Sequence, residues 1–100
     1  MAARVAARFE SMVWNRTASR AESFGRETGT AVAADPTALV DWADVVITCL
    51  PTSVEVREVV EGVGDAWRAD QLLVDCTSGA PAGSRAIAEW LRRSGVHFVD

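Results

Sequence analysis

The chain has 100 residues, 49% of them hydrophobic and 24% charged, with a formal net charge of −4 at pH 7. This length predicts one compact domain, and the composition is that of a globular protein rather than a disordered one. The ten basic residues are all arginines, and they are interspersed with fourteen acidic residues, which argues against a nucleic-acid partner. No apolar run approaches the roughly 20 residues of a membrane span, and no secretory signal is evident.

The first third of the sequence predicts a helix, a strand and a second helix. Residues 2–9 place apolar side chains on one helical face, and Ser11 to Trp14 form a short strand. In the next helix Ser19 and Glu22 have the spacing of a capping box, and Gly29 can end it in the left-handed conformation.

A second strand and another helix follow. Thr30 to Ala33 form the strand, and Asp35-Pro36 opens the helix with an aspartate at the cap and proline in the first turn. The residues expected to face inward from this helix are Leu39, Trp42 and Ala43.

Asp44 to Leu50 is the clearest strand in the sequence. Its run of apolar and β-branched residues is typical of a central parallel strand covered on both faces, and Pro51 stops it. Cys49, in this strand, and Cys76, just after a later one, lack metal-binding spacing. We expect a pair of buried, reduced thiols, which favours the cytoplasm, and no metal site.

The remaining sequence continues the alternation of helix and strand. A helix has Val56, Val59 and Val60 as its buried stripe, and Pro81 opens the last helix. Alternating strands and helices with short loops predict a doubly wound parallel α/β sheet. The expected ranges are a helix over residues 53–61, a strand over 71–75, a helix from 81 and a strand over 96–99.

Asn15-Arg16-Thr17 follows the first predicted strand. In a dinucleotide-binding fold, the residues at this strand end bind the adenosine ribose of the cofactor. An acidic residue at such a strand tip accepts from the ribose 2′-OH, whereas an arginine pairs with a 2′-phosphate. This chain has Arg16 and no carboxylate until Glu22, which favours NADP over NAD. A solvated loop arginine is the alternative interpretation.

The usual opening of a dinucleotide-binding fold is missing from the sequence. Such a fold begins with a strand and a glycine-rich turn that lets the backbone approach the pyrophosphate. Here the first predicted element is a helix, and the spacing of Gly25, Gly29, Gly62 and Gly64 fits no such turn. The predicted fold is therefore a Rossmann-type sheet that lacks its first strand and glycine-rich turn.

Three segments in register resemble the amino-terminal domain of the β-hydroxyacid dehydrogenases. These are Val13 to Thr17, Ala43 to Pro51, and Val74 to Ser78 with Pro81. The group includes 3-hydroxyisobutyrate and 6-phosphogluconate dehydrogenases and the related imine reductases. The resemblance implies that residues 1–100 are a partial NADP-binding domain, truncated at both ends, from a protein about three times as long.

The resemblance also implies roles for individual residues. It places Thr77 at the substrate edge and Ser78 near the nicotinamide, although relatives commonly have the two hydroxyl residues in the reverse order. Thr77 and Ser78 can instead be residues that satisfy backbone donors before a helix, and Asp75 can be either a structural cap or a site residue. The cofactor-binding residues implied are Asn15, Arg16 and Thr17 at the 2′-phosphate, Leu50 and Pro51 through the backbone, and Ser78.

The expected function is NADP binding within an oxidoreductase that transfers hydride between the nicotinamide and a small hydroxy acid or a related substrate such as an imine. The family's catalytic lysine lies in a helical second domain, which the chain lacks, and the chain has no lysine, so whether it is itself an enzyme stays open. A homo-oligomer would form through that absent helical domain. The alternatives are a non-catalytic nucleotide-binding or oligomerisation module and a non-functional truncated fragment.

Overall fold

The computed structural model of the protein describes residues 9–77 and 81–100, and the chain divides into two compact units, Met1–Leu39 and Val40–Asp100. The helix expected over residues 2–9 lies outside the described residues except for Phe9. Every strand pair described is parallel, which confirms the predicted α/β class.

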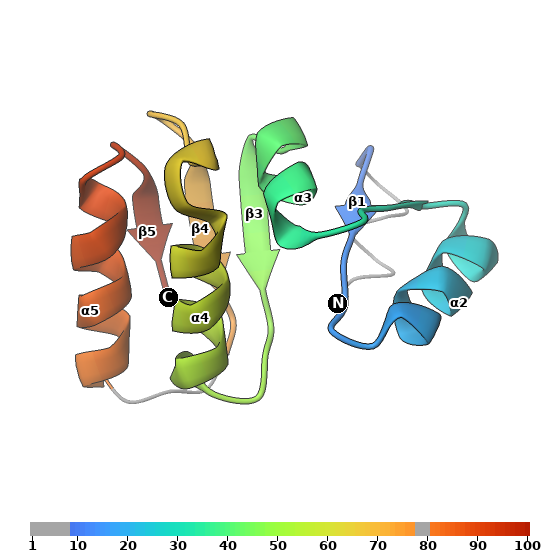
Figure 1. Cartoon of the computed structure of the whole chain (residues 1–100), viewed down its shortest axis with the longest axis horizontal. Helices are drawn as coiled ribbons and strands as arrows, with labels where there is room; N and C mark the ends of the chain where they lie inside the picture. Colours follow the sequence, from blue (N-terminus) through green and yellow to red (C-terminus); the bar gives the residue numbers. More distant parts are fainter. Residues whose placement is uncertain (1–8, 78–80) are drawn as a thin grey trace. The chain divides into compact units, whose positions relative to one another are not determined.

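The first unit contains a short pair of parallel strands connected through a helix (Figure 1). The strands are β1 (Met12–Val13) and β2 (Ala31–Val32), and the helix between them is α2 (Ala18–Thr28). The Ala33 N–H donates to the Val13 carbonyl at 2.8 Å and so extends the pairing by one bond. Both predicted strands are present, and each is shorter than its predicted range.

Two glycines fix how α2 ends and how closely it approaches β2. Gly29 follows the helix with φ 73°, and its N–H donates to the Gly25 carbonyl at 2.8 Å, as the left-handed cap predicts. A Cβ on Gly25 would lie 2.8 Å from Val32 Cγ2 and 2.9 Å from the Thr30 carbonyl oxygen. The helix and strand are therefore too close for any side chain at this position.

Helix α3 (Pro36–Trp42) begins where the sequence predicts, because Asp35 Oδ1 accepts a hydrogen bond of 2.8 Å from a backbone N–H of the first turn. Its buried face differs from the prediction. Val40 is 2% exposed, whereas Trp42 is 45% exposed. Ala43 is buried together with Val40, since residues three apart share a helical face. Inward placement of Trp42 is therefore wrong in the described structure.

The second unit is a three-stranded parallel sheet with helices on one face (Figure 1). The strands follow the order β3-β4-β5, and Val46 is in register with Leu73, which is in register with Phe98. The elements are β3 (Val45–Thr48), α4 (Ser53–Val63), a 3₁₀ turn (Gly64–Ala66), β4 (Leu72–Asp75), α5 (Pro81–Arg92) and β5 (His97–Val99).

The two faces of this sheet differ in burial. Val46 and Leu73 share one face and are buried, whereas Val45 and Ile47 on the opposite face are 52% and 42% exposed. β3 is also the edge strand of its sheet among the described strands. The prediction that this strand is covered on both faces is therefore wrong here. An apolar run indicates that a strand can be buried, but whether it is buried depends on which other elements pack against it.

The core of the second unit forms between the sheet and its two helices. Val56 on α4 is fully buried as predicted, and Ile87 and Leu91, which share one face of α5, are fully buried as well. Trp67 is also buried, and its indole N–H donates to the Val60 carbonyl at 2.9 Å near the end of α4. This bond satisfies the one polar atom of the ring.

Both cysteines are exposed, and neither belongs to a disulfide. The prediction of buried thiols is wrong: Cys49 comes just after β3 rather than within it, and Cys76, just after β4 as predicted, is exposed as well. In the described parts of the chain, no helix has the length and apolar character needed to cross a membrane.

Candidate functional site

The turn from β1 to α2 has a defined hydrogen-bonded geometry. Asn15 Oδ1 accepts a hydrogen bond of 2.9 Å from the Thr17 N–H, so the asparagine side chain closes an Asx turn around Arg16. Arg16 is exposed at the middle of this turn. The three residues predicted to bind the ribose therefore form a single turn in the first unit.

Thr17 is the residue that caps α2. Its backbone is extended, with φ −92° and ψ 105°, and its side chain makes no capping hydrogen bond. The capping box expected from Ser19 and Glu22 is wrong, because the helix begins at Ala18 and both residues lie inside it. Local spacing alone could not separate the two possible caps, since both threonine and serine are preferred there.

The first turn of α2 favours a negative ligand. It contains no acidic residue, and Arg16 lies one residue before the Thr17 cap. The N-terminal end of a helix carries a partial positive charge and N–H groups that point along the axis. A phosphate group beside this turn would meet a guanidinium and a helix N-terminus together.

In the second unit, a buried aspartate organises the carboxyl edge of β3 and β4. Asp75 is 6% exposed, and its Oδ1 accepts hydrogen bonds of 2.9 Å from both Thr48 Oγ1 and the Thr77 N–H. Thr48 is 9% exposed and lies opposite Asp75 in the strand register. Of the two interpretations of Asp75, these contacts support the structural one, because its carboxylate is used to hold the protein's own groups.

The same edge brings Leu50 and Thr77 together. The Leu50 N–H donates to Thr77 Oγ1 at 2.8 Å, although the two residues are 27 positions apart. The hydroxyl uses its oxygen as the acceptor here and keeps its own proton for donation. Two residues predicted to line the cofactor and the substrate are thus direct partners at one strand edge.

A short turn connects this edge to α4. Pro51 is exposed and follows Leu50 directly. Thr52 caps the helix by accepting from the Val54 N–H at 3.2 Å and by donating to Glu55 Oε2. Threonine followed by glutamate three residues later is the capping-box spacing, a signal that the sequence carried and that our sequence analysis missed.

Helices α4 and α5 approach each other closely at their first turns. A Cβ on Gly83 would lie 2.7 Å from Ser53 Cβ and 3.0 Å from Ser53 Oγ. Only glycine fits at this distance. Because α4 follows β3 and α5 follows β4, the two helix N-termini meet near the Leu50–Thr77 contact.

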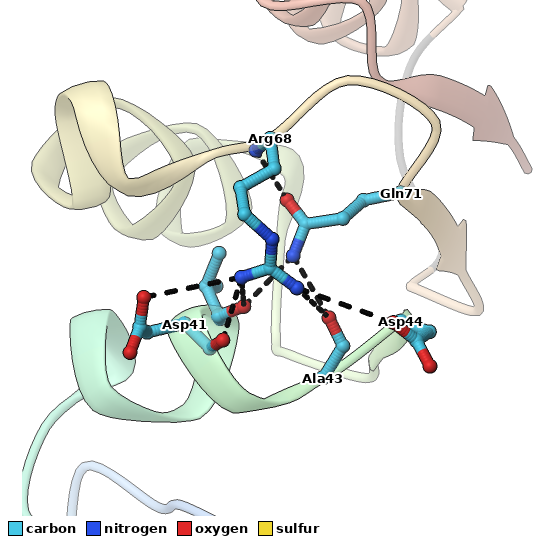
Figure 2. A network of polar contacts seen from close by, with 6 residues as sticks. Asp41, Ala43, Asp44, Arg68 and Gln71 are labelled. Carbon is cyan, nitrogen blue, oxygen red and sulfur yellow. Dashed lines mark hydrogen bonds and ion pairs between the residues drawn. The ribbon is translucent and has the colours of Figure 1, made fainter.

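A second polar network lies at the opposite edge of the sheet, before β3 and β4 begin (Figure 2). The Arg68 side chain donates to the Asp41 and Ala43 carbonyls at 2.5 and 3.2 Å, and Gln71 Nε2 donates to the Val40 and Ala43 carbonyls at 2.8 Å each. These carbonyls end α3 and have no partners within the helix. The network is therefore structural, and it lies away from the predicted site residues of this unit.

The predicted site residues fall into two groups. Asn15, Arg16 and Thr17 belong to the first unit, whereas Leu50, Pro51 and Thr77 belong to the second. Ser78 lies outside the described residues. Across residues 9–77 and 81–100, no cluster of three or more histidine, cysteine or acidic side chains is arranged to hold a metal ion.

Comparison with known proteins identifies what this arrangement resembles. The chain superimposes on 3-hydroxyisobutyrate dehydrogenase from Mycobacterium tuberculosis with a TM-score of 0.86 and 28% identity, covering 97% of this chain and 33% of that one. It superimposes on an imine reductase from Streptomyces aurantiacus with a TM-score of 0.83 and 32% identity, covering 97% and 34% of the two chains. The mitochondrial 3-hydroxyisobutyrate dehydrogenase of Mus musculus is 31% identical over 78 residues, which are 75% of this chain and 23% of that protein.

The chain thus spans between about a quarter and a third of the length of these relatives. The family description "NAD binding domain of 6-phosphogluconate dehydrogenase" matches residues 1–100, which is the entire sequence. The parallel α/β fold and the order of the three motif segments agree with this match. The chain belongs to the family of NAD-binding domains found in 6-phosphogluconate dehydrogenase.

Proposed function

We propose that this chain binds NADP as part of an oxidoreductase that transfers hydride between the nicotinamide and a small hydroxy acid or an imine. The observation that carries the choice of cofactor is the β1–α2 turn, where Arg16 stands in an Asx turn before a helix whose first turn has no acidic residue. A carboxylate at this place would favour the 2′-OH of NAD, whereas a guanidinium favours the 2′-phosphate.

Each residue of this turn has a distinct role in the proposal. Arg16 pairs with the phosphate oxygens, and Asn15 fixes the turn through its bond to the Thr17 N–H. Because the Thr17 side chain makes no capping bond, its hydroxyl remains suited to donate to a phosphate oxygen. The fit rests on donors and positive charge, which are the groups that a dianionic phosphate requires.

The carboxyl edge of β3 and β4 positions the nicotinamide end of the cofactor in this proposal. Leu50 and Pro51 present backbone to the cofactor, and the Leu50–Thr77 hydrogen bond holds that backbone in place. The bound cofactor supplies or accepts the hydride. The chain's residues contribute position and electrostatics, and the sequence contains no lysine for the proton transfer that the family resemblance assigns to one.

The test of the cofactor choice is Arg16→Ala, with affinities for NADP and NAD measured by calorimetric titration. Loss of a charge-assisted hydrogen bond costs about 1.5–3 kcal/mol, so we expect NADP binding to weaken roughly 10- to 150-fold. Binding of NAD, which has no 2′-phosphate, should change less than about threefold.

Arg26→Ala is the matched control because Arg26 is also an exposed arginine but lies in the last turn of α2, away from the helix N-terminus. It should leave the ratio of the two affinities unchanged. Equal losses of NADP and NAD in Arg16→Ala would refute the 2′-phosphate assignment.

A further inference from the structure

The two cysteines occupy matching positions on neighbouring strands. Thr48 and Asp75 are the last register pair of β3 and β4, and Cys49 and Cys76 are the next residue of each strand. The Cys76 N–H donates to the Thr48 carbonyl at 2.8 Å. This bond continues the parallel ladder by one step and sets Cys76 opposite Cys49.

The burial pattern places both thiols on the same face of the sheet. Along β3, exposed and buried residues alternate, so that Cys49 shares the open face with Val45 and Ile47. Along β4, Cys76 follows the same alternation and lies on the less buried face with Val74. Both cysteines are exposed, which agrees with this placement.

The spacing of parallel strands puts the Cα atoms of the two cysteines in the range found for disulfides. Neighbouring strands lie about 4.8 Å apart. Cysteines joined by a disulfide have Cα atoms roughly 4.4–6.8 Å apart. Residues that face each other on adjacent strands and point to the same side satisfy this condition on the Cα atoms.

We propose that Cys49 and Cys76 form one redox-active dithiol site, which a peroxide oxidises to an intramolecular disulfide. In the first step the thiolate of one cysteine attacks hydrogen peroxide, an S–O bond forms as the O–O bond breaks, and hydroxide leaves. The second thiolate then attacks the sulfenic sulfur, the S–S bond forms and the S–O bond breaks. The leaving hydroxide takes up a proton, so two thiols and one peroxide give one disulfide and two water molecules.

The pairing distinguishes this site from two independent surface cysteines. A lone sulfenic acid proceeds with more peroxide to the irreversible sulfinic acid, whereas a neighbouring thiol intercepts it first. The sequence contains only these two cysteines, so no third thiol of this chain competes for the sulfenic acid. The disulfide would be exposed and therefore open to reduction by a small dithiol.

The test counts thiols in the purified protein after brief treatment with hydrogen peroxide, followed by catalase, denaturation and alkylation with iodoacetamide. We expect each oxidised wild-type molecule to lose both alkylation sites together and two hydrogens in mass. Dithiothreitol should restore both sites, and digestion should release a peptide pair that joins Cys49 to Cys76. Wild-type molecules that keep one alkylated thiol and carry oxygen on the other would overturn the proposal.

Cys49→Ser and Cys76→Ser are the matched controls, and each should give at least tenfold more sulfinic acid than the wild type at the same peroxide dose. Phenylarsine oxide, a trivalent arsenical that binds two thiols at once, provides an independent readout. One equivalent should block both thiols of the wild type and bind each single variant at least tenfold more weakly. Equal binding to all three proteins would refute the pairing. The wild-type thiol count decides the question even if a variant does not fold.

Discussion

Replacing Gln71 by methionine tests whether a buried amide holds the end of α3. The side chain is 3% exposed and makes three hydrogen bonds. Its Nε2 donates to the Val40 and Ala43 carbonyls at 2.8 Å each, and its Oε1 accepts from the Arg68 N–H at 2.5 Å. Methionine keeps the length of the side chain and removes every donor and acceptor.

The expected loss follows from these three bonds. Each typical hydrogen bond contributes about 0.5–1.5 kcal/mol to the free energy of unfolding, and a buried group left without a partner costs more. The Arg68 side chain also donates to the Val40 and Ala43 carbonyls, at 3.4 and 3.2 Å, and so keeps both partly satisfied. We therefore expect Gln71→Met to lower the free energy of unfolding by about 2–3 kcal/mol, out of the roughly 5–15 kcal/mol typical of a domain.

Urea unfolding followed by tryptophan fluorescence measures this change, and the midpoint should fall with an unchanged m-value. The control is Arg68→Met, which removes the other donor to the same carbonyls. The Arg68 side chain is 44% exposed, so water can replace much of what it donates, and its ion pairs with Asp41 and Asp44 are long, at 3.9 and 4.0 Å. The loss should therefore be nearer about 1 kcal/mol. A Gln71→Met protein as stable as the wild type, beside a strongly destabilised Arg68→Met, would refute the reasoning.

Three further predictions concern the strand edge, the core and catalysis. Thr77→Val removes the acceptor of the Leu50 N–H and should weaken NADP binding several-fold in a titration, whereas Thr77→Ser keeps the acceptor and should keep the affinity. Equal affinities in both variants would contradict the positioning role. Leu73→Ala, at a fully buried position of β4, should cost about 2–5 kcal/mol in urea unfolding, against less than about 0.5 kcal/mol for Val54→Ala at an exposed one. The 100-residue chain should form no NADPH from a panel of hydroxy acids, because it has no lysine and arginine does not release its proton; clear turnover would place the active site elsewhere.

Local signals predicted the element order and most helix ends. The Asp35 cap depends on residues within a few positions of one another, as does the left-handed Gly29 cap, and both are confirmed. The buried stripe of α4 is likewise a local pattern: Val56 and Val60 are buried as predicted, whereas Val59 is only half-buried. Such features are set by neighbouring residues, which is the information that a single sequence carries directly.

The errors arise where a distant part of the chain decides the outcome. The contact between Thr48 and Asp75 joins residues 27 positions apart, and no sequence spacing indicates it. Trp42 was expected inside because it is apolar, but α3 is rotated so that Val40 faces the buried side. Exposure of the open face of β3 likewise depends on which elements cover the sheet, and an apolar run cannot report this.

For the candidate site, the sequence identified the local turn but not the contacts between strands. Asn15, Arg16 and Thr17 are adjacent in sequence, so their common turn could be predicted from the strand that precedes them. The Leu50–Thr77 bond required the strand register, which only the structure supplies. The roles of these residues toward NADP remain predictions that the titrations above test.

The close approach of Gly83 to Ser53 has a consequence for how freely this chain can vary. Any side chain at position 83 would have to push the first turns of α4 and α5 apart, because Ser53 Cβ would lie only 2.7 Å from the new Cβ. These turns follow the loops that carry Leu50 and Thr77, so the displacement would reach the strand edge without any direct contact to a ligand. In a saturation-mutagenesis library selected for cofactor binding, position 83 should therefore tolerate as little variation as a binding residue does. Position 62, where a Cβ would meet nothing within 4 Å, should accept alanine readily.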